Sequence, residues 1–147
     1  LSCREKLVEQ TESLVEPAEL DDDDRYAAFR LLLEPLARFR LDPLLHPEGD
    51  ALYHSLQVFE RGREARPYDE EFLLACLLHD VGLGLDPQHA VPAALGALQG
   101  LITERTRFLI EHRHTATIYL KTGDCPRAVR KSENFEDLLL LARCNRD

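Results

Sequence analysis

The sequence places a histidine and an aspartate side by side, His79 and Asp80, directly after the apolar run ACLL at 75–78. Burying two adjacent ionisable groups costs free energy unless something compensates them. A divalent metal ion would compensate both, because neutral imidazole and carboxylate are ordinary ligands of such ions. The pair therefore predicts a metal site.

Other histidines fall on the apolar sides of predicted helices. His54 lies four residues before Val58, which puts it on a partly buried stripe, and His112 lies four residues after Phe108. His89 lies near the start of another helix. Several imidazoles that converge on one carboxylate inside a helical bundle form a typical metal-site arrangement.

The elements that must position these side chains are predicted to be helices throughout. Apolar spacing, cap residues and glycine or proline boundaries predict helices over about 4–15, 24–36, 51–63, 70–80, 86–98, 103–112 and from 132 onward. We expect Asp24, Thr103 and Ser132 to be N-caps, and Pro35 to kink or end its helix. No alternating strand pattern of useful length competes, so the sequence predicts a single-domain, all-α bundle over residues 1–147.

Composition narrows the function classes. The 147 residues carry a formal charge of −9, which argues against binding to a nucleic-acid backbone. No apolar stretch reaches the length needed to span a membrane, and the first residues lack a signal-peptide core. The four cysteines form no C-x-x-C pair, so we expect a reduced, cytoplasmic setting. The chain has no methionine, as a segment of a longer product can lack one.

Four segments carry a resemblance to a known family: HPEGD at 46–50, YHSLQ at 53–57, LLHDVG at 77–82 and LLLLARCNRD at 138–147. The order H…HD…H…H on helices resembles the HD superfamily of metal-dependent phosphohydrolases. The first and last segments are most similar to the HD domain attached to some bacterial tRNA nucleotidyltransferases. The resemblance covers about residues 40–147 and implies an HD-type bundle, with the helices before residue 40 packed on it.

Carried over position by position, the resemblance implies that His54, His79 and Asp80 are metal ligands. The family's fourth ligand is an aspartate on the last helix. By register it falls on Asn145, four residues after Leu141 on the core-facing stripe. Asparagine coordinates through its carbonyl oxygen without adding charge, so we expect weaker metal binding.

Two-metal members of the family imply further ligands, which fall on His89 and His112. The family often has two adjacent histidines at the second place, whereas here Arg113 precedes His114, which makes His114 an alternative to His112. We favour His112, because its spacing from Phe108 points it inward.

The resemblance predicts a phosphohydrolase that acts on a nucleotide or another small phosphate ester. One or two divalent ions (Mn, Fe, Co, Ni, Zn or Mg) would activate a water as the nucleophile. Asp80 is the residue expected to bridge two ions, because its carboxylate has two oxygens.

Two functions other than phosphohydrolase remain open. Di-iron oxygenases of the inositol and phosphonate-cleaving types have similar H…HD…H…H ligands. The other alternative is a degenerate HD domain that binds a nucleotide or metal, or scaffolds a partner, without catalysis. Asn145 and Arg113 motivate it, as does Leu83, which stands where many members have a phosphate-binding lysine.

Overall fold

The fold is built from helices. The computed structural model describes residues 20–45 and 49–146. Within these ranges the only strand-like pairing is an isolated antiparallel bridge between Arg40 and Asp50, so the all-α prediction is confirmed. None of the helices in these ranges has both the length and the apolarity needed to cross a bilayer. The helix predicted over about 4–15 lies outside the described residues.

The α-helices and the short 3-10 helices (η) follow one another with brief connections. In chain order they are α2 (Asp22–Leu33), η1 (Glu34–Arg38), α3 (Ala51–Ala65), α4 (Glu70–Leu78), η2 (Val81–Gly84), η3 (Pro87–His89), α5 (Ala90–Ala97), α6 (Glu104–Glu111), α7 (Arg113–Thr122), α8 (Arg127–Arg130) and α9 (Phe135–Arg146).

Side-chain caps fix where several helices begin. Asp50, Asp69 and Thr103 accept hydrogen bonds from backbone N–H groups at the starts of α3, α4 and α6. The prediction for α2 was wrong by three residues. Its N-cap is Asp21, whose carboxylate accepts from the N–H of Asp24.

Two other boundaries also differ from those predicted. The α2 helix ends at Leu33, and the chain continues through Pro35 as the 3-10 helix η1. Proline has no N–H to donate within an α-helix, which explains why α2 ends before it. The last helix begins at Phe135 rather than at Ser132. Ser132 instead accepts from the N–H of Asn134 in the turn before α9.

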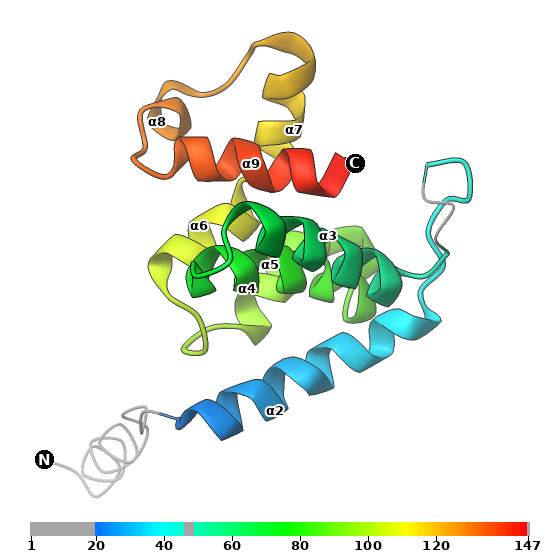
Figure 1. The fold of residues 1–147 in the computed structure, drawn as a ribbon. Helices are drawn as coiled ribbons and strands as arrows, with labels where there is room; N and C mark the ends of the chain where they lie inside the picture. Colours follow the sequence, from blue (N-terminus) through cyan, green and yellow to red (C-terminus); the bar gives the residue numbers. More distant parts are fainter. Residues whose placement is uncertain (1–19, 46–48, 147) are drawn as a thin grey trace, which may run out of the picture.

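The core forms around α4, which packs against α3, α6 and α9. Phe72 and Leu78 of α4 are fully buried, as are Leu109 of α6 and Leu138 of α9. Figure 1 shows α2 along one side of this bundle, with α7, α8 and α9 on the opposite side. The α4 helix is apolar almost all round, which is the expected pattern for a helix surrounded by others.

Two glycines allow the close contacts that place the residues around His79. A Cβ on Gly62 of α3 would lie 2.6 Å from Sγ of Cys76 on α4, so these helices approach more closely than a larger residue permits. A Cβ on Gly82 of η2 would lie 1.7 Å from the carbonyl oxygen of Ala90, at the start of α5. The turn after Asp80 is therefore held against α5.

Candidate metal centre

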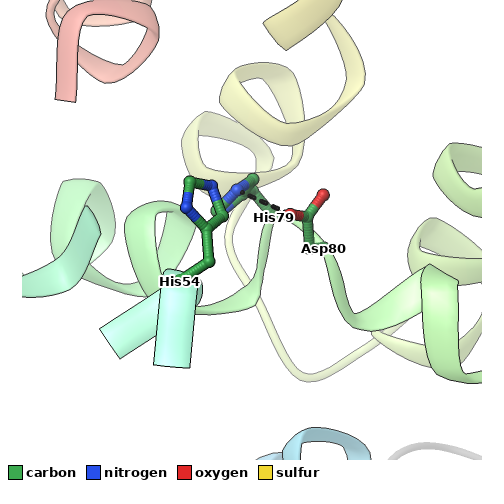
Figure 2. Close-up of side chains that lie close together, drawn as sticks. All are labelled: His54, His79 and Asp80. Atoms are coloured by element: carbon green, nitrogen blue, oxygen red, sulfur yellow. Dashed lines mark ion pairs between the residues drawn. The ribbon is translucent and has the colours of Figure 1, made fainter. Parts of the chain in front are cut away.

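Three buried side chains meet where α3 passes the end of α4. These are His54, His79 and Asp80, and one ligand atom of each lies within 4.8 Å of the other two (Figure 2). The two imidazole centroids are 5.7 Å apart, and the three residues are only 2%, 1% and 6% exposed. Two ligands of one ion with bonds of about 2.1 Å stand up to about 4.2 Å apart. Small side-chain movements therefore suffice for the three residues to share a cation.

The position of His54 follows from the spacing along α3. His54, Val58 and Gly62 are four residues apart, so they form one stripe, and all three are buried. Because Gly62 lets α3 approach Cys76 of α4, the same stripe carries His54 toward the end of α4. His79 lies there, three residues after Cys76. One close helix contact therefore brings the two imidazoles together.

The hydrogen bond of His79 defines which ring nitrogen faces the site. Nδ1 lies 2.8 Å from the carbonyl oxygen of Cys76, which can only accept, so Nδ1 carries the proton. Nε2 is buried, lies 3.1 Å from Oδ2 of Asp80 and makes no hydrogen bond to the described residues. In the neutral ring, a lone pair then faces a carboxylate oxygen, which is unfavourable unless a cation lies between them. The backbone bond is also the support that metal-bound imidazoles usually have.

Asp80 is held in its ionised form by its neighbours. Burial by itself would raise the pKa of this carboxyl, but its close contacts, first with His79 and then with the guanidinium of Arg113, hold its pKa well below the ordinary range. Nη1 of Arg113 lies 2.8 Å from Oδ1 of Asp80, and the arginine is only 7% exposed. Asp80 therefore presents one oxygen to His79 and the other to a buried guanidinium.

Asn145 of α9 completes the group. Its Oδ1 lies 2.6 Å from Nε2 of His54. The donor set of His54, His79, Asp80 and Asn145 offers two imidazoles, one carboxylate and one amide oxygen. This set fits a divalent transition metal, which takes nitrogen and oxygen ligands together, and the unpaired Nε2 of His79 is the structural sign of that fit.

His89 and His112, which were also predicted as ligands, do not belong to this cluster. His89 is 71% exposed in its side chain, and its Nδ1 lies 3.2 Å from Oδ2 of Asp86. The inward orientation expected of His112 is not observed, because its ring packs on Phe108 with 4.6 Å between centroids. The N–H of His112 donates to the carbonyl oxygen of Phe108, so the helical spacing between the two residues holds, but neither of them lines the pocket beside Asp80.

A pocket of about 590 Å³ opens beside the group, lined by His54, Asp80, Arg113 and Asn145 among others. His114 and His89 also line it, whereas His112 does not. The pKa of His114 is lowered, first by its partial burial and next by the charge of Arg113.

Other parts of the pocket wall are apolar. Leu41, Leu83, Val91 and Pro92 contribute to it. Leu83 is the position at which the family resemblance implies a lysine, so here that part of the wall carries no charge. The wall of the pocket therefore combines polar side chains of the candidate metal centre with apolar side chains.

Arg113 was not predicted as a site residue, because it separates two histidines, His112 and His114, that were themselves the candidate ligands. A signal for it was present. Arg113 lies three residues before Ala116, and both are buried on the inner face of α7. An arginine on an apolar stripe is rare without a buried anion, and Asp80 is the buried carboxylate that it meets.

Comparison with known proteins does not place the chain in a family. No family model matches it, and no curated protein matches it significantly. The HD resemblance therefore stays a prediction from the motifs. Fold and site together define an all-α protein with a buried cluster of two histidines and an aspartate, next to an arginine and an open pocket.

Proposed function

We propose that this protein is a metal-dependent phosphohydrolase that acts on a nucleotide or another small phosphate ester. The observation that carries the proposal is the buried cluster of His54, His79 and Asp80, in which Nε2 of His79 faces a carboxylate without a hydrogen bond. A divalent ion bound there supplies Lewis-acid activation of water for attack on phosphorus. The HD motifs point to the same chemistry.

The residues of the pocket suit a phosphorylated substrate. Arg113 and His114 supply N–H donors to the pocket, which is also lined by proposed ligands. Leu41, Leu83 and Val91 line another part of the pocket and suit a less polar body, such as a nucleoside. A phosphate bound to these donors would offset part of the positive charge that Arg113 and a divalent ion bring together.

The test is hydrolysis by the full chain after metal removal and reloading. We expect phosphate release from nucleoside monophosphates or p-nitrophenyl phosphate with Mn²⁺, Ni²⁺ or Zn²⁺, and none after chelation. His79→Gln removes a proposed ligand, and we expect it to lower kcat/KM by at least about a hundredfold. Elemental analysis of both proteins reports metal content independently of turnover.

His112→Gln is the matched control, since it makes the same change to a histidine that lies outside the pocket. We expect this variant to keep the metal content and the activity of the unchanged protein. Equal loss in the two variants would contradict the assignment of His79 as a ligand. Oxygen consumption by the iron-loaded protein, without phosphate release, would favour the di-iron oxygenase instead.

A non-catalytic binding module is the second candidate, and one observation favours it. Asp80 and His54 already have partners within the protein, namely Arg113 at 2.8 Å and Asn145 at 2.6 Å. Such contacts stabilise a site without metal. Nucleotide binding that is unchanged by chelation, with no turnover under any metal, would support this candidate over the phosphohydrolase.

A further inference from the structure

The two oxygens of Asp80 have different neighbours. Oδ2 lies 3.1 Å from Nε2 of His79, on the side where the proposed ligands gather, and Oδ1 lies 2.8 Å from Nη1 of Arg113. A carboxylate that bridges two cations uses one oxygen for each. We propose that the guanidinium of Arg113 takes the place of a second metal ion, so that the centre holds one divalent ion. This inference rests on the proposed function.

Burial keeps the guanidinium in that place. The side chains of Arg113 and Asp80 are each 9% exposed. Separating such a pair leaves an uncompensated buried charge, which is costly. Arginine also stays protonated at any physiological pH. The positive charge next to Oδ1 is therefore a permanent part of the protein, unlike a metal ion that exchanges with solvent.

The ligands that a second ion would need are not gathered at Oδ1. His112 packs on Phe108, and the ligand-atom cluster of the described residues comprises His54, His79 and Asp80 alone. His114 lines the same pocket as Asp80 but does not belong to that cluster. His89 is largely exposed and pairs with Asp86 instead.

The charges of the group also suit one ion. The four proposed ligands contribute a single negative charge, from Asp80, and Arg113 neutralises it. One divalent ion then leaves two net positive charges, which match a dianionic phosphate. A second divalent ion would put three cations around one carboxylate, and their mutual repulsion at short range is large in a buried site.

Arg113 has donor capacity to spare for that phosphate. Nη1 is engaged by Asp80, which leaves the N–H groups of Nη2 for a phosphate, whereas Nε is buried away from solvent. Arg113 lines the pocket. The planar fork of a guanidinium matches phosphate oxygens, which a lysine ammonium does not. Arg113 would thus hold Asp80 and orient the substrate's phosphate.

The experiment counts metal ions rather than turnover. Metal-free protein is titrated with Mn²⁺, free Mn²⁺ is measured by electron paramagnetic resonance, and folding is checked by circular dichroism. We expect one ion per chain in the unchanged protein and in Arg113→Lys, which keeps the charge. We expect two in Arg113→His, which exchanges the charge for a ligand next to Oδ1. Arg127→Gln, a change at an exposed arginine, is the control and should bind one ion.

Two further measurements keep the inference testable if one variant fails to fold. Arg113→Gln removes the charge without adding a ligand as strong as imidazole, so we expect one ion bound at least about tenfold more tightly. In Arg113→Lys loaded with Mn²⁺, we expect the Kd for inorganic phosphate to rise by about tenfold, because the fork is lost.

Each outcome has a separate meaning. Two ions in the unchanged protein, or one ion bound with unchanged Kd in both Arg113→His and Arg113→Gln, would overturn the role of Arg113 and leave the proposed phosphohydrolase intact. No Mn²⁺ binding by any of these proteins would overturn the metal centre, and the proposed function with it.

Discussion

Asp69 begins α4 and Asp80 follows its end, and each carboxylate pairs with an arginine. At the first end, Arg105 donates to both oxygens of Asp69 at 2.6 Å and to Asp137 at 2.8 Å. These side chains are 20–26% exposed. The Arg105 cluster (Arg105, Asp69 and Asp137) thus joins the starts of α4, α6 and α9 at the edge of solvent.

The pair at the other end has the same chemistry in a different environment. Arg113 and Asp80 are about nine-tenths buried, with one contact of 2.8 Å between them. Nε2 of His79 and Nε of Arg113 lack hydrogen-bond partners among the described residues. A satisfied pair near solvent can be retained for structure alone. A buried group with unpaired polar atoms costs stability, so its presence points to a ligand.

Removing the charge of Asp80 should have the largest effect. Asp80→Asn keeps the shape but leaves Arg113 buried without an anion, so we expect the free energy of unfolding to fall by about 3–5 kcal/mol. Loss of the one carboxylate ligand should also weaken Mn²⁺ binding by at least about a hundredfold. Urea unfolding and calorimetry measure these effects. Unchanged Mn²⁺ affinity in folded protein would contradict the assignment of Asp80 as a ligand.

Adding a carboxylate to the same end should act in the opposite direction. Asn145→Asp supplies the charge that the amide next to His54 lacks, and we expect Mn²⁺ to bind about tenfold more tightly or better. Asp137→Asn changes the other end of α9 and is the matched control, with no expected change in Kd. Titration calorimetry on both variants measures the Kd for Mn²⁺. An unchanged Kd in Asn145→Asp would mean that residue 145 is not a ligand.

Breaking the Arg105 cluster should lower the stability of the protein and leave metal binding unchanged. In Arg105→Gln the hydrogen bonds to Asp69 and Asp137 are lost, but water reaches the carboxylates. We therefore expect the free energy of unfolding to fall by about 1–2 kcal/mol, less than for Asp80→Asn. Mn²⁺ stoichiometry and Kd should stay as they are. A change in either would show that the two ends of α4 are coupled.

The smallest expected effect is the pH dependence of the stability that Asp69 contributes. The hydrogen bond from Arg105 holds the pKa of Asp69 below its ordinary value of 3.8, although burial opposes this shift. A carboxyl with a lowered pKa in the folded state stabilises the protein fully above the unfolded value. It loses that contribution as the pH falls through the folded value.

We therefore expect the stability difference between the unchanged protein and Asp69→Asn to be constant above about pH 5 and to shrink below the ordinary pKa. Asparagine keeps the N-cap of α4, so the comparison isolates the charge. Urea unfolding between pH 2.5 and 6 measures the difference. A difference that persists at the acid end would contradict the ionic origin.

The residues near His79 show which structural features could be predicted from the sequence. The apolar run before His79 required a buried α4, and the spacing of His54 from Val58 required an inward-facing side chain; both are observed. The register of Asn145 with Leu141 placed it toward the core, and its amide lies next to His54. These predictions rest on helix periodicity, which is a local property of the chain.

Two other predictions needed more than helix periodicity. The spacing of His112 from Phe108 holds and the two rings pack together, but neither residue lines the pocket beside Asp80. The start of α2 was placed at Asp24, because four consecutive aspartates offer several equivalent caps, and the hydrogen bond at Asp21 decides between them. A boundary depends on which of several similar local contacts the packed helices allow.

Composition and periodicity by themselves determined that the chain forms an all-α bundle and that His54, His79 and Asp80 face inward, because burial of apolar stripes dictates orientation along each helix. Only the tertiary structure decided that Arg113, rather than His112, reaches Asp80. That contact depends on the turn between α6 and α7 and on the close approaches at Gly62 and Gly82. A pairing between distant residues follows from how helices dock, which no local pattern encodes.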